Sequence, residues 1–84
     1  QLTTLFAWDE ATFLRNTEGS AIRRIGFQRW SRNIAVALGN AAPAPAIVAA
    51  LQSRADDPSP LVREHVSWAI ERQRALAAAA LPSN

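Results

Sequence analysis

Arginine is the residue type in this sequence best suited to bind an anion. All of the chain's nine basic residues are arginine, and five of them lie between Arg15 and Arg32, where Glu18 is the single acid, so this stretch carries a charge of +4. The rest of the chain has four arginines and six acids, a charge of −2. A guanidinium presents five donors in a planar fork that matches phosphate or carboxylate. The cluster therefore favours an anion-binding surface, although a GC-rich genome would produce the same preference for arginine.

Four of these arginines and one asparagine are the candidate binding residues. Arg23 and Arg24 are consecutive, so on a helix they point about 100° apart and cannot both face a core. Arg29 and Arg32 are three residues apart and share one side of a helix, and Asn33 lies four residues after Arg29. We predict that these residues contact phosphate groups. The alternatives are solvated surface arginines or, for Arg29 and Arg32, ion pairs with three acids: Glu10, Glu18 and Glu64.

Other chemistry is poorly represented in the sequence. The chain has no cysteine and a single histidine, His65, which excludes disulfides, cysteine-ligated metal clusters and the usual histidine-based metal site. No nucleophile or carboxylate is arranged beside His65, so we predict no catalytic residue. Trp30 and Trp68, like Trp8, occupy positions typical of a core, and one that proved to be exposed could stack on an unpaired base. We expect no membrane segment, and a cytoplasmic location is compatible with the composition.

The first half of the chain is predicted to hold two helices and a turn. A helix is indicated in residues 8–17, with Asp9 as its N-cap, Trp8 packed on Phe13 across the cap, and Gly19 as its end. Residues 20–26 predict a short helical turn that begins at a serine and ends at a glycine. Residues 27–40 predict a helix that ends at Gly39 and Asn40. Its apolar positions are Phe27, Trp30, Ile34, Ala37 and Leu38.

Two proline-marked boundaries divide the second half. Pro45 follows an alanine-proline linker and is expected in the first turn of a helix. The apolar face of that helix is Ile47, Val48, Leu51 and Ala55. Ser59 and Pro60 are expected as the N-cap and first residue of the last helix. That helix is apolar on two sides and therefore needs two neighbours. One side is Val62, Val66, Ala69 and Ile70, and the other is Leu61, His65 and Trp68. Residues 75–84 are predicted to extend it as a frayed tail, because nothing ends it before Pro82.

A 32-residue shift aligns the apolar positions of the two predicted long helices. Trp30, Ile34 and Leu38 then fall on Val62, Val66 and Ile70. A period near 30 residues made of two helices is typical of a helical solenoid, in which each hairpin buries its face against the next. We therefore predict an all-α fold of about four helices plus a short helical turn, forming a HEAT-like helical repeat over residues 1–74.

Two segments of the sequence resemble those of a known protein family. "DPSPLVREHVSWAI" is similar to the second helix of a HEAT repeat, which typically opens with an aspartate, four spacer residues and Val-Arg, here Asp57, Val62 and Arg63. Together with "TEGSAIRRIGFQRWSRNIAVALGN", it resembles the C-terminal HEAT-like domain of epoxyqueuosine reductases, iron–sulfur and cobalamin enzymes that complete queuosine in tRNA. The resemblance covers about residues 5–72, nearly the whole chain.

The resemblance implies a role for this chain other than catalysis. The 4Fe-4S clusters and the cobalamin would belong to an N-terminal catalytic domain of the parent chain, and this segment would help to dock tRNA around the anticodon stem-loop. It also implies a structural contact between Arg63 and Asp57. The alternative is a structural or protein-interaction module that packs on the catalytic domain.

Overall fold

The computed structural model describes residues 1–80, with only the main chain described at Arg24, and all regular elements in that range are helical. The elements are α1 (Leu2–Phe6), α2 (Glu10–Asn16), the 3-10 helix η1 (Ala21–Ile25), α3 (Phe27–Asn40), α4 (Pro45–Gln52) and α5 (Pro60–Ala80). The all-α prediction is confirmed, and the helix that the sequence analysis missed is α1. Its five residues are too few to show an apolar period, so only tertiary packing stabilises it.

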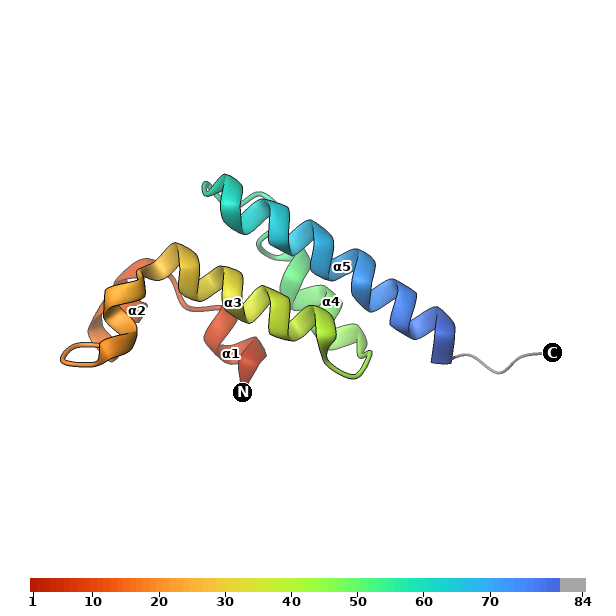
Figure 1. Cartoon of the computed structure of the whole chain (residues 1–84), viewed down its shortest axis with the longest axis horizontal. Coiled ribbons are helices and arrows are strands. Elements are labelled where there is room, and N and C mark those ends of the chain that lie inside the picture. The colour runs from red at the N-terminus through yellow and green to blue at the C-terminus, as the bar shows by residue number, and fades with distance from the viewer. Residues whose placement is uncertain (81–84) are drawn as a thin grey trace.

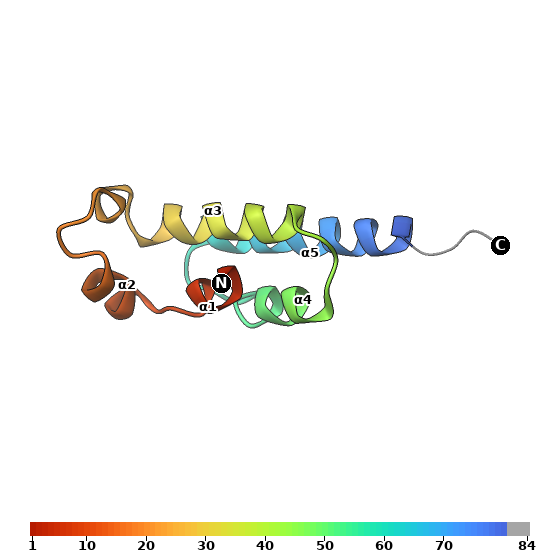
Figure 2. The same cartoon turned by 90° about the horizontal axis from the view of Figure 1, so that it is seen from below.

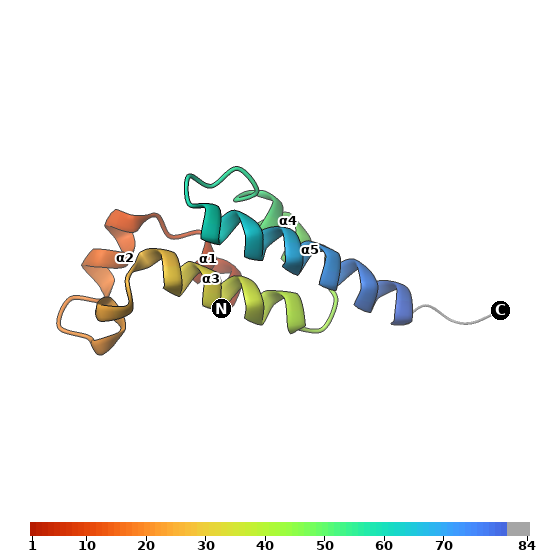
Figure 3. The ribbon, with the colours of Figure 1, turned by 45° about the horizontal axis from the view of Figure 1, so that its top comes forward.

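The helices form two layers. One layer holds α3 and α5, which run side by side in the same direction, and the other holds α1, α2 and α4 (Figures 1 and 2). The connection through α4 returns the chain to the start of α5, so α3 and α5 can lie parallel (Figure 3). The core lies between the layers. Its buried apolar residues are Phe6, Phe13, Trp30, Ile34, Ala35, Leu38, Leu51, Val62, Val66 and Ala69.

The predicted helix starts are confirmed. The Asp9 carboxylate accepts a hydrogen bond from the Thr12 main-chain N–H at 2.8 Å, and this bond lowers the pKa of Asp9. Ser20 caps η1 through the Ile22 N–H, and Ser59 caps α5 through the Val62 N–H. The turn ends as expected at a glycine, since Gly26 has a φ of +83° that other residues rarely adopt.

Two details at the end of α2 differ from the prediction. The helix ends at Asn16, and Gly19 lies in the following turn with a φ of +75°. The ring that stacks on Trp8 is Trp30, with 5.2 Å between centroids, whereas Phe13 packs on Phe27 and Trp30. The predicted staple between Trp8 and Phe13 is therefore absent from the ring contacts of residues 1–80, because the indole of Trp30 occupies the space beside both rings.

The apolar face of α3 is confirmed at Trp30, Ile34 and Leu38, with Phe27 packed against the core, but not at Ala37. Ala37 is exposed, while Ser31 and Ala35 are buried, because α3 packs on both α5 and the second layer. Gly39 does not end the helix but lies within it, buried against α5. A Cβ there would come within 3.0 Å of the Ala69 Cα, so glycine permits a close approach of the two helices. Ala55, predicted on the face of α4, is exposed beyond the end of that helix.

One of the two apolar sides of α5 is covered, except that Ile70 is only partly buried. Val62, Val66 and Ala69 are buried, whereas Leu61 and His65 are half-buried and Trp68 is exposed. The helix continues through Ala80, past the predicted boundary at residue 74. Pro82 lies outside the described residues, and fraying of residues 75–84 stays a prediction. Among residues 1–80, no helix combines the length and apolar character needed to cross a membrane.

Candidate nucleic-acid interface

The predicted binding residues of α3 lie on its outer side. Trp30, Ile34 and Leu38 turn toward the core, which leaves Arg29 and Asn33 exposed and Arg32 half-buried. The Arg32 Nε donates a hydrogen bond to the Asn33 Oδ1 at 3.2 Å. This bond uses one of five guanidinium donors, so Arg32 keeps most of its capacity to bind an anion.

The predicted residues of η1 lie just before α3. Arg23 is exposed and lines an open hollow together with Gly19, Ser20 and Ala21. The main chain of Arg24 lies in the same 3-10 helix, and its side chain is outside the described structure. Because η1 leads through Gly26 directly into α3, the fold places the two predicted pairs on consecutive elements.

Arg23, Arg29 and Arg32 have no acidic partner in the described structure. Within residues 1–80, Arg24 aside, one ion pair is present, between Arg54 and Asp57. The alternative pairs of Arg29 and Arg32 with Glu10, Glu18 or Glu64 are not formed there. The charge of these arginines is therefore available to a ligand.

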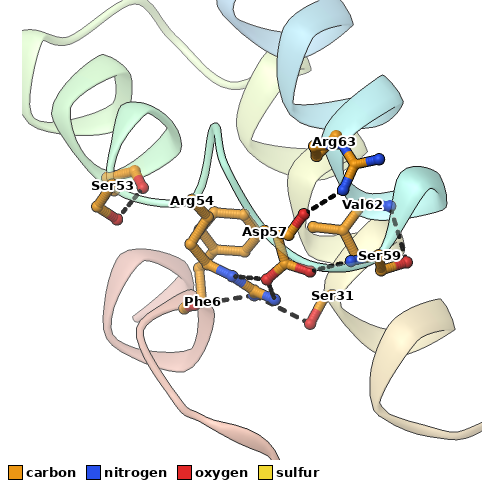
Figure 4. Close-up of polar contacts among 9 residues, drawn as sticks. Phe6, Ser31, Ser53, Arg54, Asp57, Ser59, Val62 and Arg63 are labelled. Atoms are coloured by element: carbon orange, nitrogen blue, oxygen red, sulfur yellow. Dashed lines mark hydrogen bonds and ion pairs between the residues drawn. The ribbon is translucent and has the colours of Figure 1, made fainter.

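Arg54 is a largely enclosed hub that the sequence analysis missed; its side chain is 11% exposed (Figure 4). Its Nη1 donates to the Phe6 carbonyl oxygen at 3.2 Å and to the Ser31 Oγ at 3.0 Å, and its Nε and Nη2 donate to the Asp57 Oδ1. The guanidinium also lies over the ring of Phe6, 4.6 Å from its centroid, and over that of Phe27. One side chain thus joins α1, α3 and the α4–α5 connection.

Asp57 completes this hub. Burial raises the pKa of its carboxyl, but the Ser59 N–H hydrogen bond and the hydrogen bond and charge of Arg54, with the charge of Arg63, outweigh burial and lower it. The predicted contact between Arg63 and Asp57 is present in a different form. The Arg63 Nη1 donates to the Asp57 main-chain carbonyl at 2.6 Å, because the carboxylate is taken by Arg54 and Ser59.

Gln73 is a second polar residue that was missed. It is buried in α5, and its Nε2 donates to the carbonyl oxygens of Leu38 at 2.8 Å and Ala41 at 2.9 Å. Its Oε1 accepts from the Ala44 N–H. Gln73 therefore satisfies the carbonyls at the end of α3 and fixes the following linker. The signal was its position, since it follows Val62, Val66 and Ala69 at helical spacing.

The described side chains form no metal site, and the one histidine is bonded within its own helix. The ring Nδ1 of His65 is 2.8 Å from the Leu61 carbonyl oxygen, a contact within α5. In residues 1–80, no three side chains of the histidine, cysteine, aspartate and glutamate types gather as a metal site. Since the chain also has no cysteine, its residues do not fit an iron–sulfur cluster.

The fold and this surface define an all-α, two-layer helical domain with an arginine-bearing side. The chain is homologous over most of its length to a segment of epoxyqueuosine reductases. It is 65% identical over 69 residues to the Xanthomonas campestris pv. campestris protein, a match that covers 82% of this chain and 19% of that protein. The Alicycliphilus denitrificans protein is 64% identical over 77 residues, covering 83% of this chain and 21% of its own length.

The Escherichia coli epoxyqueuosine reductase matches a similar share of the chain at a slightly lower identity. It is 59% identical over 73 residues, which cover 87% of this chain and 19% of that protein. The chain therefore spans about a fifth of the length of these relatives. No family model and no solved structure matches the chain.

Proposed function

We propose that this chain is the tRNA-docking segment of an epoxyqueuosine reductase, and that the reduction of epoxyqueuosine to queuosine takes place in another part of the same protein. The relatives carry the name of that enzyme, and the chain corresponds to about a fifth of their length. The observation that carries the docking role is that Arg23, Arg29 and Arg32, on η1 and α3, have no acidic partner within the described residues of 1–80.

The proposed mechanism is electrostatic. Arg23, Arg24, Arg29 and Arg32 neutralise phosphates, and Asn33 orients Arg32 through the 3.2 Å hydrogen bond. Each neutralised phosphate releases counterions, so the affinity falls as salt rises. Double-stranded RNA is recognised mostly by its shape and backbone, which suits a row of guanidinium groups facing the stem next to the anticodon loop.

The arrangement of the helices supports a HEAT-like repeat as the scaffold. Two long helices, α3 and α5, lie parallel in one layer, and Asn40 and Arg72, which are 32 residues apart, meet through a 3.2 Å hydrogen bond. This is the separation at which the sequence aligns with itself. A repeat of this kind presents one continuous side to an extended ligand such as RNA.

The test is a salt titration of tRNA binding by the full-length protein that contains this segment. The variant Arg23→Ala/Arg24→Ala/Arg32→Ala removes three proposed phosphate contacts. We expect the slope of log K against log salt to become shallower by about 2 to 3 units. The unfolding temperature should stay close to that of the wild type, because neither the Arg23 nor the Arg32 side chain contributes to the described core.

Two single variants separate the position of an arginine from the simple loss of one positive charge. Arg29→Ala and Arg74→Ala each remove one exposed arginine, but Arg74 lies on the α4 side of α5. We expect Arg29→Ala to change the salt slope by about 0.7 to 0.9 units and Arg74→Ala to leave it unchanged. Equal slopes for wild type and triple variant would overturn the docking role.

A second candidate is a packing module for the catalytic domain. It is favoured by an apolar groove between α4 and α5, lined in part by Pro45, Val48 and Ala77. The C-terminal turns of α5 project beyond α4 (Figure 1). On this alternative, Val48→Asp would weaken the association of the segment with the catalytic part and leave the salt dependence of tRNA binding unchanged.

A further inference from the structure

Trp68 is a tryptophan that the fold holds in place and leaves 41% exposed. It lies on α5 against Gly39 of α3, where a Cβ would come within 2.8 Å of the Trp68 Cζ3. The missing side chain of Gly39 therefore lets the indole lie against the α3 main chain. Trp8 and Trp30 differ, because they stack on each other. Among the described residues, no aromatic ring stacks on Trp68.

Trp68 forms one wall of an open hollow over the seam between α3 and α5, which lie side by side in Figures 1 and 3. This α3/α5 hollow has a volume of about 320 Å³, and its other lining residues are Val36, Glu64 and His65. Val36 and Trp68 supply apolar surface. The hollow is therefore large and flat enough on one wall to receive a planar ring.

The polar groups of the hollow select for a neutral ligand that donates hydrogen bonds. The Glu64 carboxylate is an acceptor only, and its charge opposes a phosphate placed inside the hollow. The His65 Nδ1 donates its proton to the Leu61 carbonyl, since a carbonyl only accepts, which leaves Nε2 as the ring nitrogen that a ligand can reach. Nucleobases combine a flat face with N–H groups at their edge, so they meet both requirements.

Arginines stand on both sides of the hollow. Arg72 lies one turn after Trp68 on α5, and its Nε donates to the Asn40 Oδ1 at 3.2 Å. Arg32 lies one turn before Val36 on α3, about 6 Å away along the helix axis. A base in the hollow would therefore have cations at the positions its neighbouring phosphates can reach.

From this juxtaposition we propose that the α3/α5 hollow binds one unpaired RNA base, stacked on Trp68, with the adjacent phosphates beside Arg32 and Arg72. This inference rests on the proposed function and adds a contact to an unpaired nucleotide. It explains why an aromatic side chain that is already packed on Gly39 keeps an open face. The arginine row alone would bind a stem without distinguishing it from a loop.

The test compares two RNA probes in binding to the full-length protein: a short hairpin with an unpaired loop, and a blunt duplex with the same stem sequence. Trp68→Leu keeps an apolar contact with Gly39 but removes the aromatic face. We expect hairpin affinity to fall about 5- to 100-fold and duplex affinity to stay unchanged, and Trp68→Phe to keep hairpin affinity within about 3-fold. The control is Leu14→Ala, which alters a side chain of similar exposure, 37%, on α2.

The outcomes separate this inference from the function on which it rests. Unchanged hairpin affinity in Trp68→Leu, or an equal loss for both probes, overturns the base-stacking site. If that result accompanies a clear loss in Arg23→Ala/Arg24→Ala/Arg32→Ala, the docking function stands without the hollow. If the wild type binds neither probe, both proposals are wrong. A larger loss in Trp68→Phe than in Trp68→Leu also contradicts stacking.

Discussion

Arg54 and Arg29 show two opposite uses of the same residue type in one small fold. Arg54 is enclosed between the layers, with hydrogen bonds to a carbonyl, a hydroxyl and a carboxylate and with two aromatic rings beside it. Arg29 is exposed on the outer side of α3, and no acid among the described residues pairs with it. The first arginine has its donors occupied by the protein, and the second has them available to a ligand.

The surroundings of an arginine, and not its residue type, therefore decide whether it stabilises the fold or is available to a ligand. A buried guanidinium must have its donors satisfied within the protein, because an unpaired buried charge is very costly. An exposed guanidinium without a partner costs little and contributes little to folding. Counting arginines along the sequence could not separate the two, and the +4 stretch does not include Arg54, which bonds to Phe6, Ser31 and Asp57.

The largest expected effect is on folding, from Arg54→Ala. The variant leaves the Asp57 carboxylate, the Phe6 carbonyl and the Ser31 hydroxyl without their partner, so the free energy of unfolding should fall by about 3 to 5 kcal/mol. Arg29→Ala should change it by less than about 0.5 kcal/mol. Urea unfolding of the 84-residue chain, followed by circular dichroism, measures both. Similar losses in the two variants would remove the distinction between the two arginines.

A smaller effect on folding is expected from Gln73→Leu, which has a similar volume but no polar atoms. The Ala44 N–H and the carbonyls at the end of α3 would lose their partner, at a cost of about 2 to 3 kcal/mol. The same unfolding measurement tests this. Gln73→Glu keeps the acceptor for Ala44 but turns a buried carboxylate oxygen toward the Leu38 and Ala41 carbonyls. It should therefore destabilise the fold at least as much as Gln73→Leu, and a milder loss would contradict the role of the Gln73 donors.

The smallest expected effect is a loss of fold stability in acid, where the Asp57 carboxylate of the Arg54 hub becomes protonated. The pKa of Asp57 is lower in the folded chain than the usual aspartate value of about 3.9, so its ion pair stabilises the fold fully above that value and is lost as pH falls below it. We expect stability to decline below about pH 4. In Asp57→Asn the decline should be shallower, with stability at neutral pH reduced by about 1 to 2 kcal/mol. An identical acid profile for the variant would mean that other carboxylates, such as Asp9, dominate.

The helix boundaries were predictable where the sequence holds local signals. Asp9, Ser20 and Ser59 satisfy N–H groups within three residues of themselves, so their role can be recognised without knowledge of the fold. The Arg54 hub could not be predicted in the same way. Its partners Phe6 and Ser31 are 48 and 23 residues away, and only the packing of α1 and α3 against the α4–α5 connection brings them together.

The candidate site was likewise predictable only where local spacing decides which side chains are exposed. Helical spacing predicted that Arg29, Arg32 and Asn33 share the outer side of α3, because Trp30 and Ile34 are drawn inward. The hollow beside Trp68 depends on how closely α5 approaches Gly39, which is set by the tertiary contact of two helices. The sequence placed Trp68 on a face with Leu61 and His65, but no local pattern told which of the three would remain exposed.

The most direct test of the central claim is arginine-selective dicarbonyl modification of the full-length protein, read residue by residue by mass spectrometry with and without tRNA. We expect Arg23 and Arg29 to react in the free protein and to be protected by tRNA, while Arg54 stays unreactive in both conditions. Equal modification of Arg23 and Arg29 with and without tRNA, or rapid modification of Arg54, would contradict it.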